Sequence, residues 1–158
     1  MKITAQVEYG LRIMVRITRC KDEKGLSIRQ LSEAEGLSAN YVAKLTRILR
    51  MKGLINSTRG HMGGYILAKP AASITINDAL KALGGRFFDK KFCDSHAGMM
   101  KLCTNSVDCS IRSLWSVMQI ALDKLLDEVT LADMVKNEKD VSSVLNNVIE
   151  RNAAEILN

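Results

Sequence analysis

LSEAEGLSANYVAKLTRILRMKGLINSTRG, residues 31–60, contains the end of one helix, a short turn, a second helix and the beginning of a strand. Gly36 ends the first helical pattern, and Ser38 then provides a hydroxyl that can cap the second helix. The second helix has an apolar face at helical spacing, which we expect to point inward: Val42, Leu45, Ile48 and Leu49. Gly53 ends this helix. Two helices joined by so short a turn are typical of a helix-turn-helix.

The residues before this stretch predict two helices. Thr4 to Cys20 carries apolar residues at helical spacing, and the polar segment that runs to Gly25 closes this first helix. Ser27 is a favourable N-cap for the short helix that ends at Gly36. The motif at 31–60 is therefore expected to pack on one further helix.

A β-hairpin is expected directly after the second helix of the motif. LINST (54–58) and YILAK (65–69) are short extended runs, and the glycine-rich segment RGHMGG (59–64) lies between them. The sequence therefore predicts a winged helix-turn-helix, in a fold that is mainly α with a small β-hairpin wing.

The second half of the chain predicts further helices. Ile74 and Ile76 alternate as in a short strand, and Asn77 is expected to cap the helix that ends at Leu83. A longer helix begins at Ser110 and carries one apolar stripe over about five turns: Ile111, Leu114, Trp115, Met118, Leu122, Leu125, Leu126 and Val129. A stripe of this length needs another surface to cover it. We expect a homodimer in which the same helix of a second chain covers it, with packing on its own domain as the alternative.

These patterns divide the chain into four parts. Residues 1–85 are expected to form the winged helix-turn-helix domain, and residues 86–109 a loop that contains three of the four cysteines. Residues 110–135 are expected to form the dimerisation helix. The tail, 136–158, is polar with some apolar residues at helical spacing, and is expected to be either a last helix or mobile.

The net charge of +6 is unevenly distributed along the chain. Residues 1–70 contain 13 Lys and Arg against 5 Asp and Glu, whereas residues 71–158 contain 10 against 12. A basic half favours a polyanionic partner, and on a winged helix-turn-helix that partner is expected to be double-stranded DNA. The alternative is a basic surface that is merely solvated.

The second helix of the motif has the composition of a helix that enters the major groove. Short polar side chains stand at its start, where base edges are read, and cations follow along its outer side, where phosphates lie. Two further candidates are at the hairpin tip, in reach of an adjacent minor groove or the DNA backbone. The predicted DNA contacts are Ser38, Ala39, Asn40, Tyr41, Lys44, Arg47, Arg59 and His61.

The loop CDSHAGMMKLCTNSVDC, residues 93–109, has three cysteines that are too widely spaced for a structural zinc site. Such sites normally include a pair of ligands two to four residues apart. Soft thiolates on a loop suit an iron–sulfur cluster. A thiol–disulfide switch and three cysteines without a common role are the alternatives.

The chain resembles the family of winged-helix iron–sulfur transcription regulators that includes IscR and NsrR. The similar stretches cover about residues 1–135. They are EYGLRIMVRI near the start, the quoted stretch 31–60, GGYILAKPAASITINDALKAL, the three-cysteine loop, CSIRSLW and TLADMV. The resemblance implies a homodimeric regulator with a two-fold symmetric DNA operator, whose long helices cross at the dimer interface.

The same resemblance implies a cofactor. The three loop cysteines, Cys93, Cys103 and Cys109, would hold a 2Fe–2S or 4Fe–4S cluster. Part of the family takes its fourth ligand from an acidic residue of the first helix of the opposite subunit, and this chain has Glu8 in that place. His96 and Asp108 are alternative ligands.

The role of Glu8 has its own alternative, a salt bridge with Arg12 one helical turn further on. The function implied by the resemblance is control of DNA affinity by a cluster that senses redox state, nitric oxide, oxygen or iron and cluster status. A cluster-free regulator that responds through a thiol switch, a small molecule or a partner protein is the alternative.

The sequence gives little support to other classes of protein. It has no phosphate-binding loop and no nucleophile–base pairing, so we do not expect an enzyme. It has no apolar run of the length that a membrane span needs, and its first residues are interrupted by charges, unlike a signal peptide. We therefore expect a cytoplasmic protein with reduced thiols.

Overall fold

The computed structural model describes residues 3–60, 63–89, 91–99 and 102–156. Its helices are α1 (Ala5–Arg19), α2 (Ile28–Glu35), α3 (Ala39–Met51), α4 (Ile76–Leu83), α5 (Lys91–Ser95), α6 (Ser110–Asp127) and α7 (Glu138–Ile156). Two 3-10 helices, η1 (Ala71–Ser73) and η2 (Asp133–Val135), and the strands β1 (Ile55–Ser57) and β2 (Tyr65–Leu67) complete the described elements. The fold is mainly α with a small hairpin wing, as predicted.

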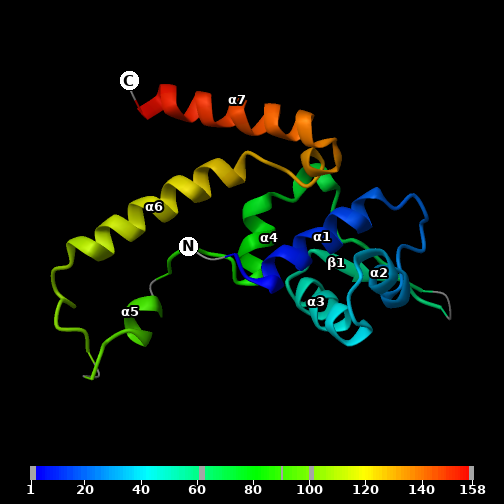
Figure 1. Cartoon of the computed structure of the whole chain (residues 1–158), viewed down its shortest axis with the longest axis horizontal. Coiled ribbons are helices and arrows are strands. Elements are labelled where there is room, and N and C mark those ends of the chain that lie inside the picture. Colours follow the sequence, from blue (N-terminus) through cyan, green and yellow to red (C-terminus); the bar gives the residue numbers. More distant parts are fainter. Residues whose placement is uncertain (1–2, 61–62, 90, 100–101, 157–158) are drawn as a thin grey trace.

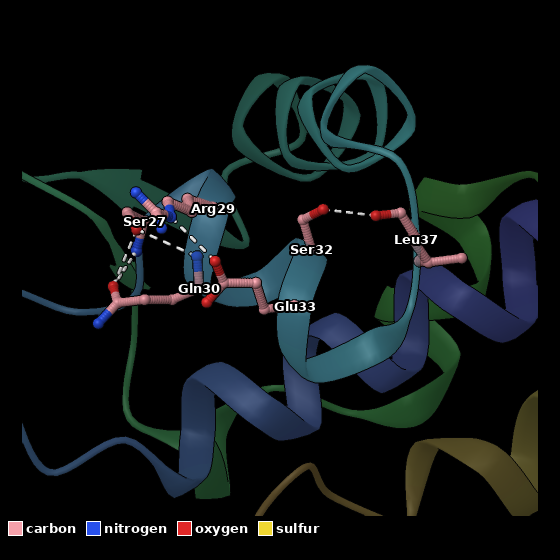
Figure 2. A network of polar contacts seen from close by, with 6 residues as sticks. All are labelled: Ser27, Arg29, Gln30, Ser32, Glu33 and Leu37. Carbon is pink, nitrogen blue, oxygen red and sulfur yellow. Dashed lines mark hydrogen bonds and ion pairs between the residues drawn. The ribbon is translucent and has the colours of Figure 1, made fainter.

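The helix-turn-helix forms where the sequence predicts it, because its signals are local. Ser27 caps α2 in a reciprocal capping box, in which the Gln30 N–H donates to Ser27 Oγ and the Ser27 N–H donates to Gln30 Oε1 (Figure 2). Gly36 ends α2 in the left-handed conformation. The Ser32 hydroxyl then donates to the Leu37 carbonyl at 2.5 Å, which fixes the turn into α3 (Figure 2).

One predicted cap is wrong. Thr75 caps α4, because its hydroxyl accepts a hydrogen bond from the Asp78 N–H at 3.0 Å. Asn77, the residue expected to do so, lies inside α4, where it is buried. Its side chain instead donates to the Asp127 carboxylate of α6 at 2.8 Å, a contact distant in sequence.

The wing is an antiparallel hairpin in which Ile55 pairs with Leu67 and Ser57 with Tyr65. The segment before α2 joins it, since Leu26 and Tyr65 exchange both backbone hydrogen bonds. Gly25 makes this approach possible. It has a φ of +72°, and a Cβ atom there would lie 2.1 Å from the Tyr65 carbonyl oxygen.

The core lies between α1, α2, α3 and α4, with the wing and the end of α6 at its edges. Its fully buried side chains are mostly aliphatic: Ile13, Leu31, Val42, Leu45, Leu49, Ile55, Ile74, Leu83, Val129 and Leu131. The inward face predicted for α3 is confirmed for Val42, Leu45 and Leu49, whereas Ile48 is half-buried.

Helix α6 extends away from this body, and the cysteine loop lies at its far end (Figure 1). The apolar stripe predicted on α6 is divided between two environments. Near the body, Leu125 and Leu126 pack against the core. Further out, large apolar side chains are exposed: Ile111, Leu114, Val117, Met118 and Ile120. In the single chain, the outer half of α6 therefore has an uncovered apolar face.

The tail forms helix α7, which contacts α6 and η2. Asn152 of α7 is buried and donates to Glu128 Oε1 at 2.6 Å, and Arg151 pairs with the same carboxylate at 3.0 Å. The described part of the tail is thus helical from Glu138 to Ile156. No helix in the described part of the chain has the length and apolarity to cross a membrane.

Asp133 gives the fold a pH-dependent contact at η2. Hydrogen bonds from Lys136 Nζ and from Thr130 lower the pKa of its carboxyl from 3.8 to about 2. A depressed carboxyl pKa contributes stability above the unfolded value, and this stability is lost as the pH falls from about 4 to about 2.

We therefore expect Asp133→Asn to lower the free energy of unfolding near neutral pH by about 1 kcal/mol, after solvent screening is taken into account. The difference from the wild type should disappear near pH 2. Urea unfolding at several pH values measures it. Glu23→Gln, which removes another exposed carboxylate, is the control for the loss of one negative charge.

Candidate DNA-binding face and cysteine cavity

Helix α3 presents the predicted reading residues on its outer side. Ser38, Ala39 and Asn40 stand exposed at its start, and Lys44 and Arg47 are exposed further along. The Ser38 hydroxyl accepts from the Tyr41 N–H at 3.3 Å, so that hydroxyl caps the helix. The arrangement offers short polar groups at the tip and cations along the side, as entry into the major groove requires.

The wing adds one described cation to this face. Arg59 is exposed at the end of the hairpin segment. His61, the other residue predicted at the tip, lies outside the described residues. Next to Arg59 in the chain, Thr58 joins the two ends of the hairpin segment, because the Gly64 N–H donates to its hydroxyl at 2.7 Å.

Helix α1 holds the start of α3 through an aromatic contact. The rings of Tyr9 and Tyr41 meet edge to face with centroids 6.2 Å apart, and the Arg12 guanidinium lies 5.3 Å from the Tyr9 centroid. Tyr41 is half-buried by this packing. The packing on α1 therefore fixes the position of the Tyr41 side chain.

Glu35 is a structural residue that the sequence reasoning missed. Its side chain is only 3% exposed and accepts from both Arg12 and Arg16 at 2.8 Å. A buried carboxylate requires such partners. The pairs tie α1 to the end of α2 and hence to the turn before α3. The sequence does contain a sign of this contact. An acidic residue stands at the end of a short predicted helix, and the helix before it carries two arginines four residues apart.

Arg12 is consequently not the partner of Glu8. The Glu8 carboxylate is exposed and makes no hydrogen bond or ion pair with any residue that the structure describes. It lies on a pocket of about 370 Å³ on the outer side of α1, together with Arg12, Arg16, Arg19 and Glu35. The alternative of a Glu8–Arg12 salt bridge is therefore wrong, and Glu8 is free to bind another group.

The three loop cysteines line one cavity. Cys93, Cys103 and Cys109 share a cavity of about 120 Å³ with Asp94 and Arg112, among other residues. All four cysteines of the chain are free thiols. The fold thus brings together three residues that are separated by up to 16 positions in the sequence, and the fourth cysteine, Cys20, lies on a different pocket.

One outer cysteine of the set lies on a helix and the other caps one. Cys109 is the N-cap of α6, and its sulfur accepts from the Arg112 N–H at 3.3 Å. Arg112 also donates from Nη1 to the Ser106 carbonyl at 3.0 Å, which folds the end of the loop back on α6. Cys93 lies on α5, a short helix that the sequence reasoning did not predict in this loop.

The cavity is not a formed metal centre in the isolated subunit. Among the residues described, no three His, Cys, Asp or Glu side chains are arranged to hold a metal ion. The donor types nevertheless suit iron, since thiolates are soft ligands and three cysteine residues line one space. Glu8 lies on another pocket, so within one subunit the structure does not bring it to the cysteines.

The alternative fourth ligands do not line the cavity either. His96 stacks on the Phe92 ring at 3.9 Å and its Nδ1 bonds the Phe92 carbonyl, so its ring is occupied outside the cavity. Asp108 is absent from the lining as well. Asp94, which was not proposed as a ligand, is the loop carboxylate that does line the cavity.

A helix-turn-helix with a wing, joined to a cysteine-lined loop and a long helix, is the architecture of a transcription regulator. The family model of Rrf2, described as an iron-dependent transcriptional regulator, matches residues 3–137. The chain belongs to this family. The resemblance to IscR-type regulators is thereby confirmed, and so is the expectation that the chain is not an enzyme.

Individual relatives agree with this assignment. Protein rrf2 of Nitratidesulfovibrio vulgaris is 33% identical over 137 residues, 87% of this chain and 89% of the relative. The HTH-type transcriptional regulator IscR of Escherichia coli is 29% identical over 144 residues, 90% of this chain and 86% of the relative.

Solved structures show the same fold. The structure of IscR from T. potens has a TM-score of 0.65 at 29% identity, covering 85% of this chain and 86% of that one. CymR, described as the global cysteine regulator of B. subtilis, has a TM-score of 0.65 at 28% identity, covering 85% and 96%. An oxidized form of Staphylococcus aureus CymR has a TM-score of 0.64 at 29% identity, covering 87% and 98%.

Proposed function

We propose that the chain is a homodimeric, DNA-binding transcription regulator whose DNA affinity is controlled by an iron–sulfur cluster. The observation that carries this proposal is the convergence of Cys93, Cys103 and Cys109 on one cavity at the far end of α6. Residues 1–85 would read DNA, residues 86–109 would hold the cluster and residues 110–135 would dimerise. The tail, 136–158, would support α6.

The three thiolates and a carboxylate would hold the cluster, of either the 2Fe–2S or the 4Fe–4S type. We propose that the carboxylate is Glu8 of the partner subunit's α1, because Glu8 of one subunit is exposed and lacks a described partner. When bound, the cluster supplies an iron centre that responds to oxidants, nitric oxide or iron supply.

Glu8 would be the ligand that dissociates first. A carboxylate is a hard ligand beside three soft thiolates, so it binds the same iron less firmly. While bound, it would tie the cysteine loop of one subunit to α1 of the other. Because α1 holds Tyr41 and the turn before α3, release of Glu8 would free the two reading helices to change their spacing.

We propose that the exposed side of α3 and the wing bind a two-fold symmetric DNA operator. Asn40 would contact base edges, and Lys44, Arg47 and Arg59 would contact phosphates. Both the charge of residues 1–70 and the exposure of these side chains support this assignment.

We expect Lys44→Ala and Arg47→Ala each to reduce the salt dependence of DNA binding. Loss of one phosphate contact should lower the slope of log K against log salt by about one unit. Fluorescence anisotropy with a labelled duplex over a range of salt concentrations measures the slope. Lys91→Ala, an exposed cation outside the face, is the control. An unchanged slope in either α3 variant would remove that residue from the interface.

The test of the whole proposal is an absorbance spectrum of anaerobically purified protein, followed by DNA titration. A cluster absorbs broadly between roughly 320 and 450 nm. The loaded and cluster-free proteins should then differ in affinity for a duplex selected from a random-sequence pool. If the protein contains no iron after anaerobic reconstitution, the cluster proposal is excluded. The proposal that the protein binds DNA is not affected by that result.

A second candidate is a cluster-free regulator that responds through its thiols. The likeness to CymR, one structure of which is described as an oxidized form, favours it as the alternative. In that case the same three cysteines would respond to oxidants directly. Mass spectrometry of the oxidised protein would then show a disulfide or an oxygen adduct among them, with no requirement for iron.

A further inference from the structure

The residues at the start of the cysteine loop are clamped to α6 by one buried side chain. Gln119 is only 6% exposed, and its Oε1 accepts a hydrogen bond from the Phe88 N–H at 2.8 Å. Its Nε2 donates to Asp123 Oδ1 at 2.8 Å. The amide is therefore satisfied on both sides and holds the backbone of the loop against α6.

Neighbouring contacts extend the clamp along two turns of the helix. Arg86 donates from Nη2 to Asp123 Oδ2 at 2.7 Å, and the Phe87 ring meets the Trp115 ring edge to face at 5.6 Å. Residues 86–88 are thus fixed by side chains at positions 115, 119 and 123 of α6.

The clamp continues toward the cavity. Phe88 is buried, and its ring lies 5.9 Å from that of Phe92, the residue before Cys93. Phe88 and Cys93 also line one pocket beside α6. A shift of the Phe88 backbone would therefore move α5 and the first thiol of the set.

The next turn of α6, from Asp123 to Asp127, is attached to α4 of the winged helix-turn-helix. Asn77 of α4 is buried and donates to Asp127 Oδ1 at 2.8 Å and to the Asp123 carbonyl at 3.4 Å. Just beyond α6, the Ile76 N–H donates to the Val129 carbonyl at 2.8 Å. Helix α4 in turn packs on both α1 and α3, and Figure 1 shows it between α6 and that body.

We propose that Gln119, with Asp123, is a positioning residue that couples the cysteine loop to the reading helix within one subunit. Asp123 joins the two sides, since its carboxylate holds Arg86 and Gln119 while its carbonyl accepts from Asn77. This route is separate from the tie through Glu8 between subunits. The proposal rests on the proposed function only in taking the loop as the sensor, and it holds for a cluster or for free thiols.

Coupling between two sites is reciprocal, so DNA binding must alter the loop if the loop alters DNA binding. The test therefore uses cluster-free, reduced, full-length protein and follows the alkylation rate of Cys93 by a maleimide, read by peptide mass spectrometry. The probe is a duplex selected from a random-sequence pool with the wild-type protein. Helix α5, which carries Cys93, lies beyond the far end of α6 from the α3 of its own chain (Figure 1). Direct shielding of Cys93 by DNA would not depend on Gln119, so it would leave the ratio of the variants at the wild-type value.

The wild type should show a change of about fivefold or more in the Cys93 rate when DNA binds. Gln119→Met keeps side-chain length but removes the acceptor for the Phe88 N–H, and Arg86→Met removes the ion pair at an exposed position. In both variants, the alkylation rate of Cys93 with DNA should differ from the rate without DNA by less than about twofold. Asn146→Met, an exposed amide on α7, should leave the ratio at the wild-type value.

The ratio separates coupling from mere loosening. A clamp that only stabilised the loop would raise the Cys93 rate equally with and without DNA, and the ratio would stay at the wild-type value. That result, or a wild type without any DNA effect, would overturn the proposal. If thermal melting shows that Gln119→Met does not fold, the rate ratio of Arg86→Met tests the proposal instead. Because no iron enters the assay, failure of the cluster hypothesis leaves this test intact.

Discussion

Replacement of any one of Cys93, Cys103 and Cys109 by alanine should abolish the iron absorbance of the anaerobic protein. The three cysteine residues line one cavity, and two thiolates do not retain the iron of a cluster well. Absorbance should fall by roughly tenfold or more, and iron determined per subunit should fall with it. The measurement is a spectrum after identical reconstitution of each variant.

Cys20→Ala is the matched control for these three variants. Cys20 is a free thiol of similar exposure, but it lies at the end of α1 on a separate pocket. Its replacement should leave the absorbance unchanged. The thermal melting point of each loop variant should also stay close to that of the wild type, because the loop contributes little to the apolar core. If Cys20→Ala removes the absorbance while Cys103→Ala keeps it, the ligand set is wrong.

Glu8 variants extend this test to the partner subunit. Glu8→Ala should assemble a cluster on three thiolates but lose it several times faster on exposure to air, since the fourth ligand is missing. Glu8→Cys should slow the loss relative to the wild type, because a soft ligand replaces a hard one. Equal rates of loss in all three proteins would exclude Glu8 as a ligand.

The sequence was sufficient for the DNA-reading motif because its signals are local. Ser27, Gly36 and Ser38 determine where helices begin and end through contacts with residues up to four positions away. Such contacts depend on a few neighbouring residues and little on the rest of the fold. The helix boundaries at the motif were therefore predicted closely.

The features that the sequence did not predict depend on contacts between segments that are distant in the chain. Thr75 and Asn77 are both suitable caps, but Asn77 is engaged by Asp127 of α6, which leaves the cap to Thr75. Arg12 could reach either Glu8 or Glu35, and the buried Glu35 obtains it because a buried carboxylate has the greater need of a partner. Neither choice can be read from local spacing.

The structure of the cysteine loop likewise depends on contacts that local spacing in the sequence does not predict. Its spacing argued against a zinc finger and left a cluster, a thiol switch or unrelated cysteines open, and the three cysteine residues line one cavity in the structure. Helix α5 was not foreseen, because so short a helix depends on the rings of Phe88 and Phe92 and on Gln119. The positions that hold the loop lie on α6, more than 20 residues further along the chain.

Leu114→Asp combined with Val117→Asp should convert the protein to a monomer. These side chains are 52% and 64% exposed in the single subunit and lie on the uncovered apolar face of the outer half of α6. A dimer interface there would place two carboxylates of each subunit in an apolar seam, at a cost of several kcal/mol. Each 1.4 kcal/mol weakens association about tenfold, so the dimer dissociation constant should rise at least a hundredfold.

The choice of positions keeps the effect on folding separate from the effect on association. Leu125 belongs to the same helix but packs against the core of its own subunit, so an acidic residue there would also unfold the monomer. Leu114 and Val117 face outward, and the double variant should therefore keep its helix content. Met51→Asp, a change at a 72% exposed residue at the end of α3, is the control for a new carboxylate on the surface.

Sedimentation velocity at micromolar concentration distinguishes the outcomes. The wild type and Met51→Asp should sediment as dimers, and the double variant as a monomer. Because a two-fold operator needs two linked readers, the double variant should also lose most of its DNA affinity while each α3 stays intact. A double variant that remains dimeric would place the subunit contact elsewhere, and a monomer that binds DNA as tightly as the wild type would show that the two readers act independently.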